Sequence, residues 1–130
     1  MDVIISCALV GMLLPYFAKI PVIIEMHKAG GYNNKQPRVQ QHQLTGRGAR
    51  AVAAHYNCFE SLAVFTVALV VVLGTNHTAE VVQWLAIGHI VARVLYCVFY
   101  WYDLDLLRSI TWLIGLMSPI TMVVLSLQAL

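Results

Sequence analysis

The stretch from Arg50 to Glu60 reads RAVAAHYNCFE, and it opens an apolar run that continues to Gly74. It carries polar and charged side chains into that run, among them His55 and Asn57. On a helix, Arg50, Asn57 and Glu60 fall within about 80° of one face. A carboxylate inside an apolar membrane helix is costly unless it is paired or faces a polar cavity. We therefore expect other parts of the chain to supply polar partners for this face.

The composition indicates a membrane protein. The chain has 130 residues, of which 60% are hydrophobic and 11% are charged, whereas soluble domains average about 25% charged residues. A soluble fold of this length cannot bury so much apolar surface. The basic residues form no patch that could follow a phosphate backbone, so we expect no nucleic-acid partner. We also expect no metal site, because no metal-ligand spacing includes the three cysteines, which lie in apolar runs.

Four apolar runs are long enough to cross a bilayer, which takes about 20 residues. They cover approximately 3–24, 48–73, 79–101 and 104–127. These lengths predict a single all-α membrane domain over residues 1–130, with four membrane-spanning helices. Pro15, Pro21 and Pro119 lie inside the predicted spans, and a proline in a membrane helix typically produces a kink.

The connections between the spans differ in charge. The second connection, GTNHT, has no lysine or arginine, and Arg108 follows the tight third turn. The first connection, about 27–47, is basic and holds Lys28, Lys35, Arg38 and Arg47. The positive-inside rule therefore places the first and third connections in the cytoplasm and both termini on the opposite side.

Asp103 and Asp105 lie where the fourth span starts. We expect these carboxylates to cap that helix, because its first turn is the positive end of the helix dipole.

The third span repeats the pattern of polar residues on one face. His89, Arg93, Tyr96 and Tyr100 lie within about 60° of each other on a helix. Arg108 begins the fourth span close to the same side of the membrane. At least three helices thus direct guanidinium, phenol, amide and carboxylate groups into one layer. Such a layer suits a small ligand with several charges, whose carboxylates meet basic side chains and whose amine meets a carboxylate.

Each of these residues also has a purely structural interpretation. Glu60 could pair with Arg93 or Arg50 and hold the helices together. The tyrosines could belong to an interfacial aromatic belt, and Arg108 could extend to lipid headgroups. Trp112 is expected to be a packing residue. The convergence of several such side chains on one layer is what favours a binding site.

Four segments occur together in this chain: NNKQPR at 33–38, Arg50-x-x-x-x-x-x-Asn57-x-x-Glu60, Arg93-x-x-Tyr96-x-x-x-Tyr100, and Leu107-Arg108-Ser109. With these segments the chain resembles, over nearly its whole length, the MAPEG family of membrane-associated proteins in eicosanoid and glutathione metabolism. It is most similar to the short bacterial members, which implies a location in the bacterial inner membrane. The resemblance implies a four-helix bundle of left-handed up-down topology that assembles as a homotrimer.

The resemblance also implies a function in detoxification. Glutathione would be the co-substrate and would lie between neighbouring subunits on the cytoplasmic side. Arg108, with Ser109, would stabilise its thiolate. A lipophilic electrophile or a lipid hydroperoxide would enter from the membrane lipid, so the implied activity is that of a glutathione transferase or peroxidase. The glutathione-binding residues would be Arg50, Asn57, Glu60, Arg93, Tyr96 and Tyr100.

Two other functions stay open at this point. The glutathione-using eukaryotic members carry an arginine one turn before the matched asparagine, where this chain has Ala53. This difference favours a non-catalytic relative that binds a lipid or a partner protein. A lone glutamate within the membrane, as Glu60 would be in a four-span chain, also suits a small proton-coupled exporter. The position of Glu60 beside Asn57 and basic residues argues against the exporter.

The predicted orientation can be tested with a fusion after Leu130. A reporter that is active only outside the cytoplasm should be active there, because both termini are expected on that side. The same reporter inserted after Lys35, in the basic first connection, should be inactive. Activity of a strictly cytoplasmic reporter after Leu130 would overturn the orientation.

Overall fold

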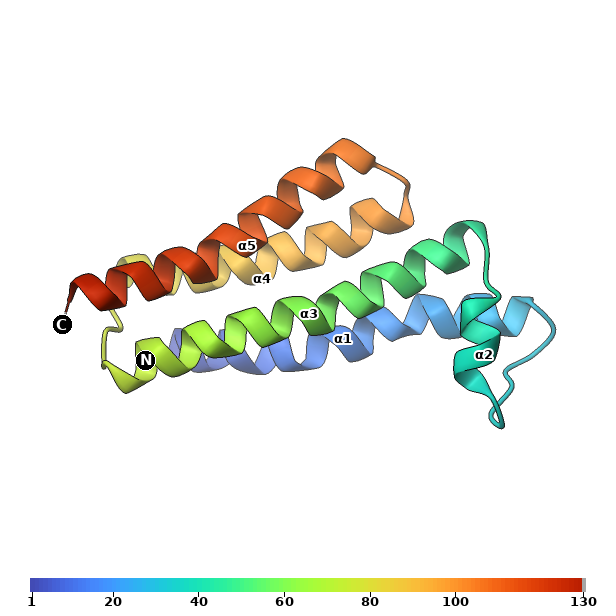
Figure 1. Cartoon of the computed structure of the whole chain (residues 1–130), viewed down its shortest axis with the longest axis horizontal. Coiled ribbons are helices and arrows are strands. Elements are labelled where there is room, and N and C mark those ends of the chain that lie inside the picture. Colours follow the sequence, from blue (N-terminus) through green and yellow to red (C-terminus); the bar gives the residue numbers. More distant parts are fainter. Residues whose placement is uncertain (130) are drawn as a thin grey trace.

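Residues 1–129, which are the part of the chain that the computed structural model describes, form four long helices and one short one (Figure 1). A bilayer offers no water to backbone N–H and C=O groups, so an apolar segment must pair them internally, as a helix does. Each long helix is long and apolar enough to span a membrane. The helices are α1 (Asp2–Lys28), α2 (Pro37–His42), α3 (Gly46–Gly74), α4 (Glu80–Trp101) and α5 (Asp105–Gln128).

The predicted all-α fold is confirmed, with one addition. The four long helices run alternately up and down the bundle and occupy the four apolar runs of the sequence (Figure 1). The short helix α2 was not predicted, because the first connection appears as polar loop in its composition. Pro37 starts it, and proline suits the first position of a helix because its missing N–H would have no partner there.

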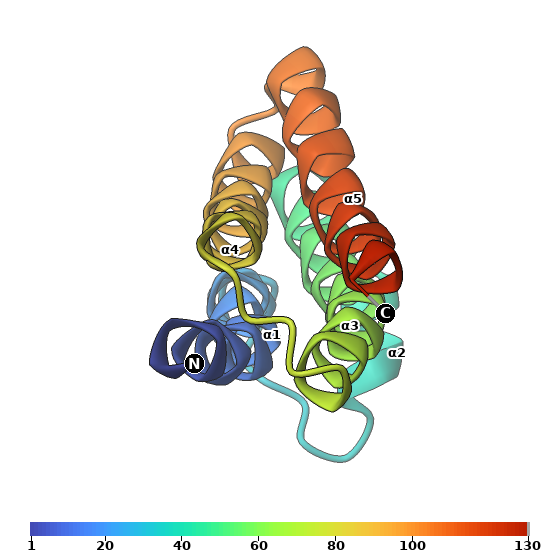
Figure 2. The same ribbon diagram turned by 90° about the vertical axis from the view of Figure 1, so that its left-hand side faces the viewer.

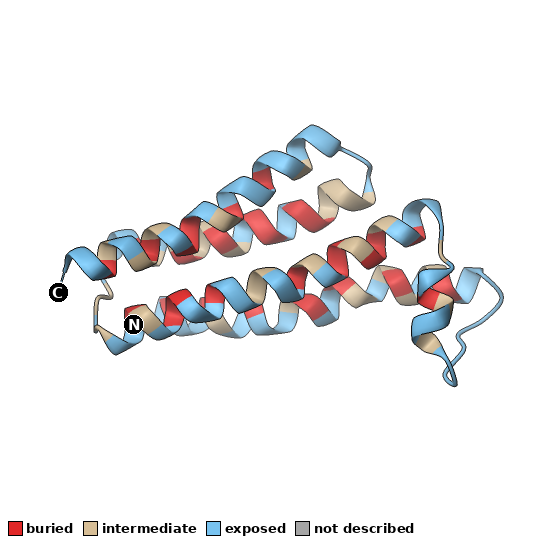
Figure 3. Ribbon diagram, viewed as in Figure 1, coloured by how far each residue is buried: buried red, intermediate tan, exposed pale blue. Residues whose placement is uncertain are grey.

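The outer surface of the bundle is apolar. Residues coloured as exposed occur along all four long helices (Figure 3). Among the large ones, Phe17 is 60% exposed, Val67 63% and Trp84 64%. Soluble monomers rarely expose so many large apolar side chains, and such a surface marks contact with lipid or with another protein. The surface therefore agrees with an integral membrane protein whose long helices are surrounded by lipid.

The four long helices pack as two pairs. Helix α1 packs mainly on α3 and helix α4 mainly on α5, and the view along the bundle shows the two pairs facing each other (Figure 2). Phe65 of α3, Val82 of α4 and Met122 of α5 are fully buried where the pairs meet near the end that holds the termini. The pairs diverge toward the other end, which carries α2 and the turn between α4 and α5 (Figure 1).

A proline in α5 explains the position of a buried histidine. Pro119 has no N–H, so the carbonyl of Gly115, four residues earlier, lacks its usual helical donor. The Nδ1–H of His89 donates to this carbonyl at 2.7 Å. The His89 ring stacks on Phe65 at 4.2 Å between centroids, and its Nε2 lies 3.4 Å from Ser61 Oγ. One side chain of α4 thus satisfies the carbonyl freed in α5 and contacts α3.

This account predicts an interaction between two substitutions. His89→Ala should lower the thermal stability of the protein in detergent, since an unsatisfied buried carbonyl costs about 1–3 kcal/mol. In a Pro119→Ala background the new N–H can donate to the Gly115 carbonyl, so His89→Ala should cost less there. Val91→Ala, on an exposed position of α4, is the control and should change little. An equal loss of stability from His89→Ala in both backgrounds would contradict this role of His89.

Candidate functional site

A buried arginine lies at the centre of the polar layer. The side chain of Arg93, on α4, is 3% exposed. Its Nη1 donates to Asn57 Oδ1 of α3 at 2.8 Å, and its Nη2 donates to the α5 carbonyls of Thr111 at 3.2 Å and Trp112 at 2.9 Å. A Cβ at Gly115 would collide with the guanidinium, so glycine is needed at that position. A buried charge is tolerated only with such partners, and Arg93 consequently joins three helices.

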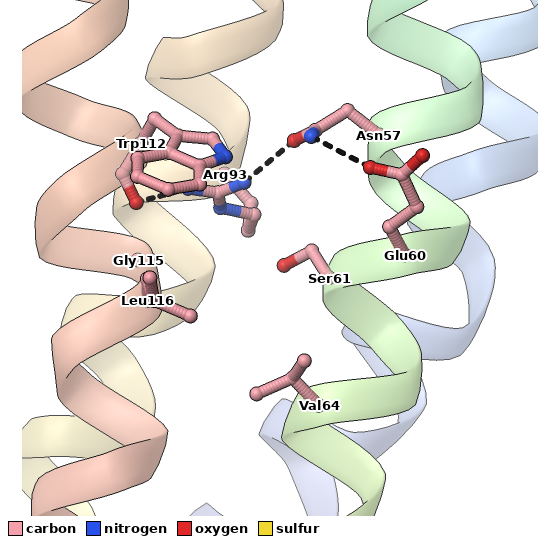
Figure 4. Close-up of a pocket in the computed structure, with 8 residues that line it drawn as sticks. All are labelled: Asn57, Glu60, Ser61, Val64, Arg93, Trp112, Gly115 and Leu116. Atoms are coloured by element: carbon pink, nitrogen blue, oxygen red, sulfur yellow. Dashed lines mark hydrogen bonds between the residues drawn. The ribbon is translucent and has the colours of Figure 1, made fainter.

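A small cavity opens between α3 and α5 beside Arg93 (Figure 4). Its volume is about 110 Å³, and we call it the Asn57 cavity. The Asn57 Nδ2 group donates to Glu60 Oε2 at 3.2 Å, so the amide bridges the carboxylate and the guanidinium. The residues around it are Asn57, Glu60, Ser61, Val64, Arg93, Trp112, Gly115 and Leu116.

Glu60 makes no ion pair with either expected arginine. It is the middle residue of α3 and is exposed on the surface of the single chain. Arg50 pairs elsewhere, and Asn57 stands between Glu60 and Arg93. The structural interpretation in which Glu60 pairs directly with one of them is therefore wrong for residues 1–129. The carboxylate keeps one oxygen, Oε1, without a hydrogen bond to this part of the chain.

A second hollow lies next to the first, at the side of the third connection. Its volume is about 290 Å³, and its lining residues are Tyr96, Tyr100, Arg108, Ser109 and Trp112. We call it the Arg108 hollow. Because Trp112 lines both spaces, they are neighbours. Trp112, which was expected to be a packing residue, is 42% exposed in the single chain and lines both spaces.

Aromatic contacts connect the two spaces along α4. The Arg93 Cζ atom lies 5.0 Å from the centre of the Tyr96 ring. Tyr96 meets Tyr100 edge to face at 5.5 Å, and Arg108 Cζ lies 4.7 Å from the Tyr100 ring. Cation–π contacts of this kind hold a guanidinium in place while leaving its N–H donors free. Tyr96 is only 6% exposed, so it does not belong to an aromatic belt at the membrane surface.

Arg108 and Ser109, the two residues predicted to act on a thiol, differ in whether their polar groups already have a partner in the protein. Neither ion pair found among residues 1–129 involves Arg108, so this guanidinium faces the hollow as an uncompensated positive charge. The hydroxyl of Ser109 donates to the carbonyl of Asp105 at 2.9 Å. A serine has a single hydroxyl proton, so Ser109 must rotate before it can donate to a ligand.

Arg50 is the predicted site residue that the structure leaves outside both spaces. Its Nη1 lies 3.5 Å from Asp103 Oδ2. This ion pair connects the turn between α4 and α5 with the start of α3. Asp103 has a φ of 63°, in the left-handed region that this turn requires. The expected side-chain cap of α5 is not formed, since its N-cap is Leu104, but Asp105 does lie in the first turn, where a carboxylate suits the helix dipole. Asp105 instead accepts from the N–H of Leu106 at 2.8 Å.

Trp112, Gly115 and Ser61 also line these spaces, although they were not predicted as site residues. A signal for two of them was present, because Arg108, Trp112 and Gly115 share one face of the fourth span. Five of the six predicted glutathione-binding residues do meet in the two spaces, as do both predicted catalytic residues. They come from α3, α4 and α5.

Comparison with known proteins identifies the family of the chain. The model of the MAPEG family matches residues 3–128 of the chain. No curated protein and no solved structure matches it. The match includes the four long helices almost completely and all the residues that line the Asn57 cavity and the Arg108 hollow. This multi-pass integral membrane protein therefore belongs to the MAPEG family.

Proposed function

We propose that the protein is a membrane-bound glutathione transferase or peroxidase that acts on lipophilic electrophiles or lipid hydroperoxides. The observation that supports this most is the unbroken line of contacts from Glu60 through Asn57, Arg93 and the two tyrosines to Arg108. It places a carboxylate at one end and an unpaired guanidinium at the other. Glutathione has an amine, two carboxylates and a thiol, and so can use both ends.

In this proposal Arg108 acts on the sulfur. A fixed positive charge next to a thiol favours the thiolate, which is the nucleophile. Arginine does not give up its proton in proteins, so Arg108 acts as a charge and not as a base. In conjugation, the thiolate forms a carbon–sulfur bond while the leaving group departs with the electron pair of the bond that breaks.

In the peroxidase reaction, the thiolate attacks one oxygen of the hydroperoxide and the O–O bond breaks. The other oxygen leaves and takes up a proton as the alcohol. A second glutathione then reduces the resulting sulfenic acid, which yields glutathione disulfide and water. The adjoining apolar surface of the helices would bring either kind of substrate from the lipid, and holding both reactants together contributes by proximity.

We further propose that the site is completed in a homotrimer. The Asn57 cavity, at about 110 Å³, is below the roughly 300–1,000 Å³ of typical ligand pockets. Glu60 is exposed at the middle of a membrane-spanning helix, where a bare carboxylate facing lipid is unfavourable. A neighbouring subunit would both cover Glu60 and enlarge the cavity. The number three is taken from the resemblance to the family.

A non-catalytic relative that binds a lipid or a partner protein is the second candidate. It is favoured by Ala53 on α3 and by the three hydrogen bonds that Arg93 already makes within the protein. These features leave fewer positive groups for the carboxylates of glutathione. Direct binding of glutathione by the purified protein separates the two candidates.

Glu60→Gln should weaken glutathione binding. It keeps the shape of the side chain but removes the charge that would meet the amine. Loss of a charge-assisted hydrogen bond costs about 1.5–3 kcal/mol, or roughly tenfold to a hundredfold in affinity. Titration calorimetry in detergent measures this, and Glu80→Gln, at the start of α4, is the matched control. Unchanged affinity together with lower thermal stability would make Glu60 a purely structural residue.

Arg108→Ala should reduce turnover more than it reduces glutathione affinity, because the guanidinium interacts most strongly when charge is on sulfur. Loss of such electrostatic stabilisation lowers kcat by roughly a hundredfold. Arg108→Lys should recover part of the rate. Ultraviolet absorbance of the bound thiolate across pH, with the conjugation rate, tests this. Arg47→Ala, at an exposed position in the first turn of α3, is the control. If Arg108→Ala has the thiolate titration and rate of the parent protein, Arg108 is not catalytic.

A further inference from the structure

A third polar pocket lies away from the two spaces described above. It is formed by α1, α2 and α3 and has a volume of about 600 Å³. None of its lining residues belongs to the Asn57 cavity or the Arg108 hollow. Lys19 comes from α1, Arg38 and Gln41 from α2, and Tyr56 and Phe59 from α3.

Three polar side chains of this pocket, one from each helix, are connected by hydrogen bonds. The ammonium of Lys19 donates to Gln41 Oε1, and Gln41 Nε2 donates to the Tyr56 hydroxyl oxygen at 3.0 Å. Gln41 is 3% exposed, so it connects the three helices from inside. Because the Tyr56 oxygen accepts this bond, its own proton is free to donate elsewhere. An ammonium has two further N–H groups in addition to the one that Gln41 receives.

The pocket carries positive charge without a compensating carboxylate. No aspartate or glutamate lines it. The ion pairs found among residues 1–129 join Lys28 with Glu25 and Arg50 with Asp103, so neither pocket cation takes part in one. Lys19 lies roughly 14 Å before the Lys28 end of α1, from the helical rise per residue. A charged side chain inside a membrane-spanning helix points to a function and to an ionic partner.

One flank of the pocket faces the lipid. Tyr16 and Ile20, on either side of Lys19 along α1, are 64% and 51% exposed, and Phe59 is 43% exposed. Tyr16 and Phe59 contact each other edge to face at 6.1 Å between ring centroids. The short helix α2 lies beside the end of the bundle that carries the basic first connection (Figure 1). A ligand here thus meets cations and a hydroxyl at the membrane interface, and apolar side chains along its flank.

We propose that this pocket binds the phosphate headgroup of an anionic phospholipid from the leaflet on the side of the first connection. Lys19, Arg38 and the Tyr56 hydroxyl donate to the phosphate oxygens, and the acyl chains lie along the exposed side chains of α1 and α3. Basic pockets between membrane helices bind anionic headgroups by this combination of charge and position. The inference does not depend on the proposed reaction with glutathione.

Native mass spectrometry of the purified full-length protein in non-ionic detergent tests the site. Phosphatidylglycerol should remain bound and raise the melting temperature, whereas phosphatidylcholine with the same acyl chains should do neither. Lys19→Gln with Arg38→Gln should reduce phosphatidylglycerol affinity at least tenfold. The control, Lys28→Gln with Lys35→Gln, removes the same charge from the same end of the molecule outside the pocket, and should reduce affinity much less.

The single substitution Arg38→Gln separates a loss of lipid binding from a loss of folding. The Arg38 side chain has no hydrogen bond or ion pair within residues 1–129, so its removal should not disturb the fold. It should lower lipid affinity without changing the melting temperature of the lipid-free protein. Equal losses in the pocket and control variants, or equal binding of both lipids, would overturn the proposal. So would displacement of the lipid by equimolar inorganic phosphate or by glutathione, since the pocket would then be a site for free anions or part of the glutathione site.

Discussion

The buried guanidinium of Arg93 is the constraint on which the bundle depends. Removing this charge from water is costly unless its donors meet acceptors, and the acceptors come from two other helices, as Asn57 of α3 and two carbonyls of α5. The guanidinium fits only because Gly115 has no Cβ. Close by, the Gly115 carbonyl accepts a hydrogen bond from His89 Nδ1–H. The polar groups inside the bundle thus determine how closely α4 can approach α5.

The same interactions give the candidate site its polarity. Asn57 uses its oxygen for Arg93 and its amino group for Glu60, so stabilising the arginine also orients a carboxylate on the outside of the single chain. The tyrosines of α4 extend this line to Arg108 without neutralising it. The structural role and the proposed binding role are therefore not separable for Asn57 and Arg93. They are more separable for Glu60 and Arg108, which stand at the ends of the line.

Charge is distributed unevenly around the end of the bundle that carries the first and third connections. Arg50 and Asp103 neutralise each other and fix the turn between α4 and α5. Lys19 and Arg38 line a pocket without a carboxylate. The first arrangement holds helices together, and the second leaves a positive potential at the lipid interface, where low dielectric makes an anion the favoured partner. Positive residues of one membrane side therefore serve different physical purposes.

The sequence by itself determined the four helices, because the length of an apolar run decides whether it can cross a bilayer. It also determined that Arg93, Tyr96 and Tyr100 share a face, since that follows from helical periodicity alone. Only the tertiary structure decided that Arg50 turns to Asp103, that Trp112 stands between two spaces, and that α2 brings Gln41 to Lys19. Periodicity gives the face of a helix on which a residue lies. The partner that this face meets depends on the packing angles and connections of the other helices, and no single segment of the sequence determines these.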